Sequence, residues 1–258
     1  MGVQTPLTKS EAEKLFPAFE IENLQATHNG VMDTTYLTKK YVLKHYEREI
    51  REKLERDKKL LQILEKEGCN TPKYIASSGE WHLYSRLDGT IPRVSCYFHI
   101  QALARFLATL HSLSLPKHPP FLAQYKLKEM LLYTKKHHFA YYKKLASLRD
   151  FSLKEEGFIH GDIFLDNTLF DGEKIAVFDF IDGGAGAFSF DIAVALMAFN
   201  PAKRRSYTKL FLQTYNQRAP KKVTLQRLQK EMQNGAKLYA LARIVKYRNV
   251  KRAKELIW

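Results

Sequence analysis

Three polar residues between positions 162 and 179 have the types and the spacing that phosphoryl transfer requires. The stretch from Phe158 reads FIHGDIFLDNTLFDGEKIAVFDFID, in which Asp162 and Asn167 are separated by four residues. Asp179 follows two short apolar runs joined at Asp171-Gly172, a dipeptide typical of a hairpin turn. Because a hairpin folds its two ends together, we expect Asn167 and Asp179 to lie close, with Asp162 in the adjoining loop.

The chemistry of these side chains fits a kinase better than it fits a solvated loop. A transferring phosphoryl group spreads negative charge over its oxygens, and a magnesium ion that bridges the phosphates is held by hard oxygen ligands such as Asn and Asp. A further carboxylate orients the acceptor hydroxyl and takes its proton. Protein kinases use the same order of catalytic Asp, four-residue gap, Asn and downstream Asp. The sequence therefore predicts a kinase that uses ATP and Mg2+.

The elements around these residues predict an α+β fold with two lobes. Short β-type patterns, two of them joined by the turn dipeptide Asn29-Gly30, occupy residues 19–26, 31–38, 41–44, 73–78 and 81–87. Apolar residues at helical spacing predict helices over residues 47–67, 97–113 and 124–148 and from about residue 188 onward. We expect an N-terminal nucleotide-binding lobe over residues 1–88 and a catalytic and substrate lobe over residues 89–258.

Composition excludes several classes of protein. The formal net charge is +15, which admits nucleic acid as a partner, but the charges are scattered and no zinc-finger, helix-turn-helix or RNA-binding signature is present. The sequence contains no run of 18 apolar residues, so no membrane-spanning helix is expected. The N-terminus lacks the apolar core of a signal peptide. Cys69 and Cys96 fit no metal or redox spacing, so we expect reduced thiols and a cytoplasmic protein.

The segment His160–Gly172 resembles the aminoglycoside phosphotransferase and choline kinase superfamily, whose members are related to protein kinases. Within it, this segment and the later Phe190-Asp-Ile-Ala-Val-Ala195 are most similar to bacterial type II homoserine kinases. The resemblance implies a protein-kinase-like fold, with Asp162 as the catalytic base and with Asn167 and Asp179 as magnesium ligands. It also implies that His160 braces the loop and that Asp191 anchors its helix against it.

On the nucleotide side, the resemblance implies a strand lysine that contacts the phosphates and pairs with a glutamate of the next helix. Lys44 stands at that place, and its partner is Glu49, Glu52 or Glu55. Aligning Gly68 with the end of the helix favours Glu55.

Two further segments are expected to contact the nucleotide. Gly30–Tyr36 is similar to a family segment Gly-x-x-Asn-x-x-Tyr, with Asp33 in place of the Asn, and it offers the hydroxyls of Thr34 and Thr35 to phosphate. The backbone of residues 84–87, which include Ser85 and Leu87, is expected to link the lobes and bind adenine.

The acceptor is expected to be a small alcohol, and homoserine is the first candidate. Its ammonium and carboxylate groups would be bound by Asp182 and Arg243. Choline, ethanolamine, an aminoglycoside and an amino sugar are alternatives. An alternative of another class is a non-catalytic, RNA-associated basic protein with a kinase-like fold, although such a protein would have no need to keep Asp162, Asn167 and Asp179.

Overall fold

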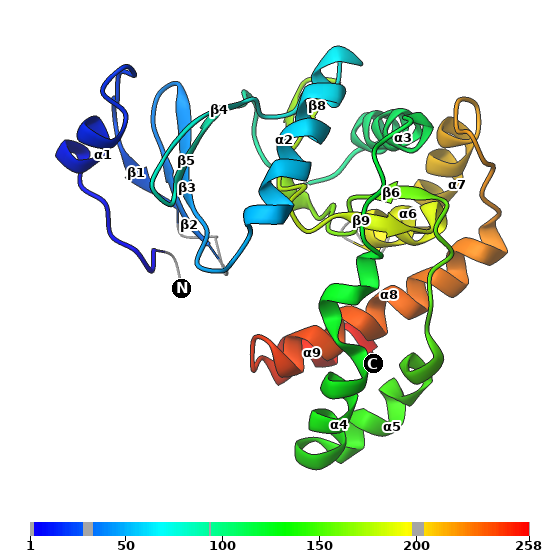
Figure 1. Ribbon diagram of the computed structural model, residues 1–258. Coiled ribbons are helices and arrows are strands. Elements are labelled where there is room, and N and C mark those ends of the chain that lie inside the picture. The colour runs from blue at the N-terminus through cyan, green and yellow to red at the C-terminus, as the bar shows by residue number, and fades with distance from the viewer. Residues whose placement is uncertain (1–2, 28–32, 93, 198–203, 258) are drawn as a thin grey trace. The chain divides into compact units, whose positions relative to one another are not determined.

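The computed structural model describes residues 3–27, 33–92, 94–197 and 204–257 (Figure 1). These residues form two compact units, and each is described by itself. The first unit contains residues 1–89 and 176–181, and the second contains residues 90–175 and 182–258. The sequence analysis placed the boundary after residue 88 and assigned residues 176–181 to the C-terminal lobe. In the structure these six residues belong to the first unit.

The first unit is built on an antiparallel sheet whose strands follow the order β1-β2-β3-β5-β4 (Figure 1). The strands are β1 (Gln25–Ala26), β2 (Thr34–Leu37), β3 (Tyr41–His45), β4 (Tyr74–Ser78) and β5 (Trp81–Ser85). In the register of the three middle strands, Leu43 stands opposite Tyr36 on one side and opposite Leu83 on the other. Leu43 and Leu83 are completely buried, and each such leucine contributes about 1.5–3 kcal/mol through burial.

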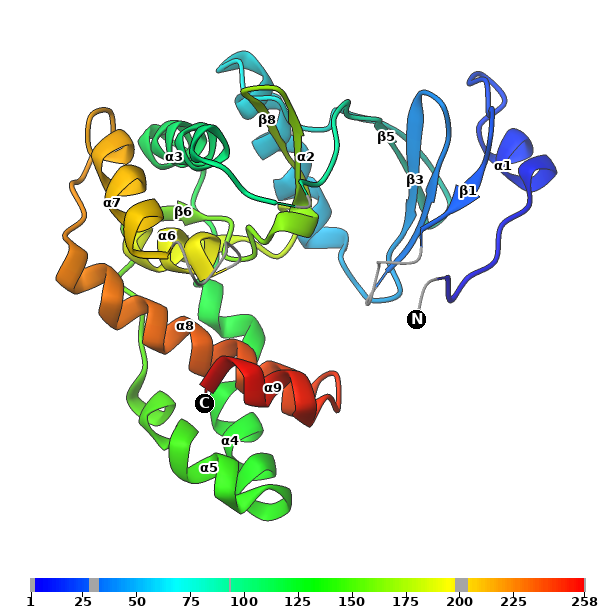
Figure 2. The same ribbon diagram turned by 180° about the vertical axis from the view of Figure 1, so that it is seen from behind.

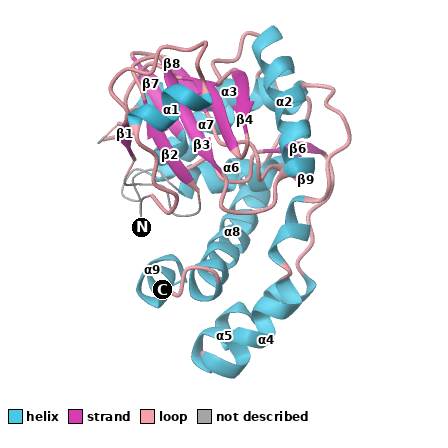
Figure 3. Ribbon diagram, turned by 60° about the vertical axis from the view of Figure 1, so that its left-hand side comes forward, coloured by secondary structure: helices cyan, strands magenta, loops and turns pink. Residues whose placement is uncertain are grey.

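A short N-terminal helix covers this apolar face. Helix α1 (Lys9–Leu15) lies across the sheet and buries Ala12 and the following Phe16 against Tyr36, Leu43 and the other residues of the face (Figure 3). Thr8 and Glu11 form a capping box at its start, in which each side chain bonds to the backbone of the other residue. This helix was not predicted, although the Thr-x-x-Glu pattern was a signal for it.

The opposite face of the sheet carries Thr35, Lys44 and His82 in one row, because residues on a strand alternate between faces. Helix α2 (Arg51–Lys66) belongs to the same unit, and its Leu54 packs with Tyr46 and Ile181. The contact with Ile181, together with a 3.1 Å hydrogen bond from the N–H of Val177 to the carbonyl of Asn70, joins residues 176–181 to this unit.

The second unit is mainly helical (Figure 2). Its α-helices are α3 (Tyr97–Ser112), α4 (Leu127–His137), α5 (Phe139–Leu145), α6 (Phe188–Met197), α7 (Arg204–Tyr215), α8 (Leu225–Val245) and α9 (Val250–Ile257). Its 3-10 helices are η1 (Phe121–Tyr125), η2 (Ala146–Asp150) and η3 (Leu165–Asn167). Strand β6 (Gly157–Ile159) pairs with β9 (Gly184–Gly186), and β7 (Thr168–Asp171) pairs with β8 (Lys174–Val177) as a hairpin.

Helix α6 lies at the centre of the second unit. Its residues from Phe188 to Leu196 are all buried, so the helix is apolar on every side apart from Ser189 and Asp191. It packs on α8, and α8 in turn packs on α9 (Figure 2). A charged group at Asp191 in such a position requires hydrogen-bond partners from neighbouring segments.

Two sequence expectations about helices and turns need comment. The predicted helix 124–148 is divided, because Lys126 has a φ of 48° and His138 has a φ of −144°, and neither value continues an α-helix. The predicted turn at Asn29-Gly30 lies outside the described residues.

Candidate active site

The loop that carries Asp162 begins where the buried strand β6 ends. His160, Gly161 and Asp162 follow Ile159 directly, and Gly161 has a φ of 75°. A Cβ atom at Gly161 would also collide with the ring of Phe121. A positive φ and this close approach both require glycine, so the middle residue of the His-Gly-Asp sequence is set by the backbone.

A buried carboxylate holds the loop in place. The side chain of Asp191 accepts the N–H of Gly161 at 2.7 Å and the N–H of His160 at 3.0 Å. Burial alone would raise the pKa of Asp191, but the hydrogen bond and the charge of His111, with the charge of His160 and the backbone hydrogen bond of Gly161, lower it below its ordinary value. Asp191 therefore stays ionised and fixes two consecutive amides of the loop, which confirms the expected anchoring of α6.

Two more helices support Asp191. Nε2 of His111, from α3, lies 3.1 Å from Oδ2 of Asp191, and Nδ1 of His111 lies 2.8 Å from the hydroxyl of Tyr215, from α7. The two ring nitrogens of His111 thus bridge Asp191 and Tyr215, which joins α3, α6 and α7 at one point. Neither His111 nor Tyr215 was singled out from the sequence, because the contacts join residues 80 and 104 positions apart.

Asp162 and Asn167 lie together within the second unit. Nδ2 of Asn167 donates to the carbonyl of Asp162 at 2.8 Å and to its Oδ2 at 3.3 Å. The N–H of Asp162 also lies 3.2 Å from Nδ1 of His160, in agreement with a bracing role for His160. Because the amide nitrogen of Asn167 is directed at Asp162, its amide oxygen is left to accept other partners or a cation.

The first unit brings Lys44 and Asp179 together. Nζ of Lys44 lies 2.8 Å from Oδ1 of Asp179 and 3.8 Å from Oδ2 of Asp33. Burial alone would lower the pKa of Lys44, but the charges of Asp179 and Asp33 raise it above its ordinary value. Asp179 has a φ of 67°, a left-handed conformation that costs a non-glycine residue on the order of 1 kcal/mol or more.

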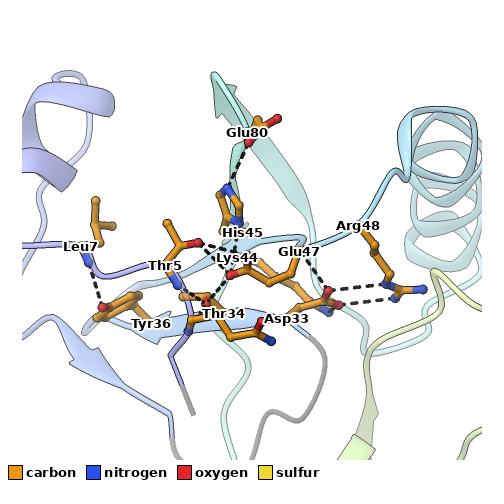
Figure 4. Close-up of polar contacts among 11 residues, drawn as sticks. Thr5, Leu7, Asp33, Thr34, Tyr36, Lys44, His45, Glu47, Arg48 and Glu80 are labelled. Atoms are coloured by element: carbon orange, nitrogen blue, oxygen red, sulfur yellow. Dashed lines mark hydrogen bonds and ion pairs between the residues drawn. The ribbon is translucent and has the colours of Figure 1, made fainter. Parts of the chain in front are cut away.

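Asp33 also has partners besides the lysine. Nη2 of Arg48 lies 3.4 Å from Oδ2 of Asp33, and the N–H of Glu47 donates to its Oδ1 at 3.3 Å (Figure 4). Asp33 is 7% exposed, so this is a largely desolvated carboxylate between two cations, Lys44 and Arg48. In the sequence, Asp33 was noted only as the residue that replaces the Asn of the family segment Gly-x-x-Asn-x-x-Tyr.

The expectation that Glu55 pairs with Lys44 is wrong. Glu55 is exposed and pairs with Lys58 at 2.8 Å. The buried positions of α2 are Leu54, Asp57, Leu60, Leu61 and Leu64, so the acidic residue on the inward face is Asp57. Its charge acts on the buried hydroxyls of Tyr46 and Tyr84. The spacing of Asp57 from Leu54 and Leu61 was the signal in the sequence that could have identified it.

The expectation that the hydroxyl of Thr34 contacts phosphate is also wrong. Thr34 is completely buried, and its Oγ1 donates to Glu47 at 2.6 Å and accepts the N–H groups of Gln4 and Thr5 (Figure 4). The hydroxyl is therefore used to hold the N-terminal segment against β2. Thr35 stands opposite Lys44 in the sheet, on the same face.

The predicted linker begins at the end of β5. The N–H of Ser85 donates to the carbonyl of Lys73, and its Oγ accepts the N–H of Lys73, each at 2.9 Å. The amide and the hydroxyl of Ser85 are therefore both bound to the backbone of Lys73. The N–H of Leu87 makes no hydrogen bond within the part of the chain that the structure describes.

The two candidate acceptor residues lie in the second unit. Asp182 follows the passage of residues 176–181, and its carbonyl accepts Nε2 of Gln124 at 2.7 Å. Burial first, and then the charges of Asp162 and Asp182 among other groups, raise the pKa of Tyr125 in η1. Arg243 lies in α8 and is half-buried.

Among the described residues there is no cluster of three or more His, Cys, Asp or Glu side chains that could hold a metal. No described helix has the length and apolar character needed to cross a membrane.

Comparison with known proteins identifies a family and a fold. A family model described as a phosphotransferase enzyme family matches residues 24–225, and no curated protein sequence matches the chain. Among solved structures, an ADP-bound aminoglycoside phosphotransferase, APH(2'')-Ib, is 18% identical with a TM-score of 0.67, and the match covers 97% of each chain.

Two other solved structures are similar at comparable levels. Macrolide 2'-phosphotransferase MphH from Brachybacterium faecium is 16% identical, with a TM-score of 0.67 and 96% of each chain covered. Choline kinase LicA from Streptococcus pneumoniae is 16% identical, with a TM-score of 0.70 and 95% of each chain covered. These likenesses confirm the predicted kinase-like α+β fold.

Proposed function

The chain belongs to the phosphotransferase enzyme family, and we propose that it transfers the γ-phosphoryl group of ATP to the hydroxyl of a small metabolite, with homoserine as the first candidate. Membership confirms the prediction of a phosphotransferase. The observation that carries the proposal is the fixed catalytic loop, in which Asp191 holds the amides of His160 and Gly161 while Asn167 holds Asp162.

Asp162 is the proposed catalytic base. Its backbone is held at both ends, by His160 at the N–H and by Asn167 at the carbonyl, and Nδ2 of Asn167 also lies 3.3 Å from Oδ2 of its carboxylate. Such a carboxylate accepts a hydrogen bond from the acceptor hydroxyl and takes its proton as the oxygen attacks phosphorus. Preorganisation of this kind removes the cost of ordering the base during the reaction.

Asn167 and Asp179 are the proposed ligands of Mg2+. The fit rests on donor chemistry: the amide oxygen of Asn167 is not used toward Asp162, and the carboxylate of Asp179 is held by Lys44. Carboxylate and amide oxygens are the ligand types that Mg2+ prefers. The bound ion would neutralise charge on the nucleotide phosphates.

Lys44 is the proposed phosphate lysine, with Thr35 beside it on the same face of the sheet. The carbonyl of Ser85 and the N–H of Leu87 are the groups proposed to hydrogen-bond with the adenine ring of the nucleotide. The ADP-bound state of one structural neighbour supports a nucleotide substrate. The cytoplasm, where ATP is present and thiols stay reduced, is the proposed compartment.

Homoserine is proposed because the segment His160–Gly172 resembles that of type II homoserine kinases. Arg243 would bind its carboxylate, and Asp182 would bind its ammonium group. Choline, ethanolamine, an aminoglycoside and an amino sugar are tested beside it. Nucleoside diphosphate release in the presence of each alcohol ranks these acceptors.

The variant Asp162→Asn tests the role of the base. We expect folding and nucleotide affinity to stay unchanged while turnover falls about 10²–10⁴-fold, because the amide cannot take the proton. The measurements are thermal unfolding, equilibrium nucleotide binding and phosphotransfer to homoserine or to the best acceptor of the panel.

Asp166→Asn is the matched control, because Asp166 is an exposed carboxylate of the same loop. The control should retain wild-type turnover. Wild-type turnover in Asp162→Asn would remove Asp162 from the reaction.

A further inference from the structure

Asp33 lies at one end of the strand pair β2 and β3. The two strands are antiparallel, and Thr34 stands opposite His45 in their register. The residue before β2 and the residues after β3 therefore reach the same end of the pair. This arrangement brings Asp33 into contact with Glu47 and Arg48, which are 14 and 15 positions away in the sequence (Figure 4).

Arg48 and Glu47 fix the carboxylate of Asp33. Nε of Arg48 lies 3.5 Å from Oδ1 of Asp33 and its Nη2 lies 3.4 Å from Oδ2, so the guanidinium group faces both oxygens. The N–H of Glu47 donates to Oδ1 at 3.3 Å. A rotation of the carboxylate would break several contacts at once, so Oδ2 is held toward Lys44, whose Nζ lies 3.8 Å away.

Glu47 is held in turn by two threonines. Its carboxylate accepts the hydroxyl of Thr34 at 2.6 Å and that of Thr5 at 2.9 Å (Figure 4). The turn that follows β3 is therefore joined to β2 and to the N-terminal segment. The amide that Glu47 offers to Asp33 thus has a fixed place.

Two other groups surround the ammonium group of Lys44. Nζ lies 2.8 Å from Oδ1 of Asp179 and 4.7 Å from the centre of the Tyr46 ring, which is within cation–π distance. Asp179 is also a proposed ligand of Mg2+, so a bound ion would share its carboxylate. The contacts of Asp33 with Arg48 and Glu47 depend on neither the ion nor the nucleotide.

Helix α2 supplies no carboxylate to Lys44 within the residues that the structure describes. The inward acidic residue of the helix is Asp57, and its Glu55 is exposed. The described carboxylates within ion-pair distance of Nζ of Lys44 are those of Asp33 and Asp179. In protein kinases, by contrast, a glutamate of a helix pairs with the phosphate lysine.

We propose that Asp33 is a positioning residue, which holds Lys44 toward the nucleotide phosphates in place of a helix glutamate. The inference rests on the proposed role of Lys44 in phosphotransfer. A lysine side chain has many rotamers, and a fixed ionic partner reduces the entropy that is lost when phosphate binds. At 3.8 Å the pair with Asp33 is not a close hydrogen bond, so the ammonium group keeps N–H donors for phosphate oxygens.

A double-mutant cycle tests whether Asp33 acts through Lys44. We expect Asp33→Asn to lower kcat/KM for ATP about 10-fold, because the amide keeps the shape of the side chain but offers the lysine no charge. In the Lys44→Ala background the same substitution should have no further effect. The measurement is diphosphate release with ATP titrated at a saturating acceptor concentration, and thermal unfolding of each variant reports on the fold.

Calorimetric titration with ATP in the absence of acceptor gives a readout without turnover. We expect about 10-fold weaker binding in Asp33→Asn, and equal affinities in Lys44→Ala and the double variant. Asp33→Glu keeps the charge and moves it by one methylene. It should lose only about 3-fold, again only where Lys44 is present, so it completes the cycle if Asp33→Asn does not fold.

The matched control is Glu80→Gln, which removes another carboxylate of the first unit. Glu80 lies 3.2 Å from Nε2 of His45, the residue next to Lys44, but 86% of its side chain is exposed. Because an exposed pair of this kind contributes little, kcat/KM for ATP should equal that of wild type.

The outcomes separate this inference from the proposed function. Equal losses in both backgrounds, wild-type kinetics in Asp33→Asn, or tighter ATP binding in that variant overturns the positioning role and leaves the phosphotransferase standing. Weaker ATP binding that depends on Lys44, without transfer to any acceptor, supports the positioning role and overturns the reaction. ATP binding that neither substitution changes, again without transfer, overturns both.

Discussion

At the scale of single residues, the ammonium group of Lys44 lies near two carboxylates. Asp179 and Asp33 both act on its ammonium group, and Asp33 is itself shared with Arg48. The desolvation cost of a lysine with 14% side-chain exposure is offset by these carboxylates, so Lys44 stays charged and directed. A lysine held in this way is prepared to bind phosphate without further ordering.

Lys44→Ala should impair use of the nucleotide. We expect kcat/KM for ATP to fall about 100-fold or more, because a charge-assisted contact to the phosphates is lost. The fall in kcat/KM for ATP is measured by titrating ATP at a saturating acceptor concentration. This fall should be larger than any change in KM for the acceptor.

Lys40→Ala is the comparison variant, because Lys40 is an exposed lysine just before β3 that pairs with Glu20. Its kinetics should equal those of wild type. Normal nucleotide affinity and rate in Lys44→Ala would exclude Lys44 from the site.

At the scale of elements, three helices position one loop. Helix α6 supplies Asp191, α3 supplies His111 and α7 supplies Tyr215, and all three side chains are buried. The pKa of Asp191 is lowered, so its contribution to stability is present above the ordinary value of 3.8 and is lost as the pH falls through the folded value. The loop is thus held by an ionised group at neutral pH.

Graded removal of this network should weaken both stability and the chemical step. Tyr215→Phe removes one hydroxyl and should cost about 1 kcal/mol. His111→Phe removes the side-chain partner of both Asp191 and Tyr215, while Asp191 keeps the two amides of the loop, and should cost about 2–4 kcal/mol. Urea unfolding at pH 7 measures both values. In folded His111→Phe, kcat should fall while KM for ATP is retained, since only the catalytic loop loses support.

Replacing a buried histidine elsewhere on α3 provides the control. His99 is 8% exposed, and its ring packs 4.3 Å from that of Phe170, so His99→Phe should leave kcat unchanged. Equal kcat values in His111→Phe and wild type would show that the network supports the fold alone.

At the scale of the whole chain, the sequence allowed local elements to be predicted but not the contacts between residues far apart in the chain. The hairpin between Asn167 and Asp179 followed from alternation and a turn dipeptide. The phase of α2 was misjudged, because the alignment of Gly68 favoured Glu55 while the leucine spacing places Asp57 inward. The burial of Thr34 depends on a segment 29 and 30 residues away, which no local pattern encodes.

The net charge of +15 is also a property of the whole chain. It attracts polyanions such as RNA independently of the active site. We expect weak RNA binding that falls at least tenfold between 50 mM and 200 mM salt, as counterion release requires. Phosphotransfer should be insensitive to saturating RNA, because the proposed substrates are small molecules. Filter binding and diphosphate release, measured in parallel on wild type and Asp162→Asn, separate the two properties. RNA affinity that persists at 200 mM salt, in a protein without nucleotide turnover, would favour the RNA-associated alternative over the kinase.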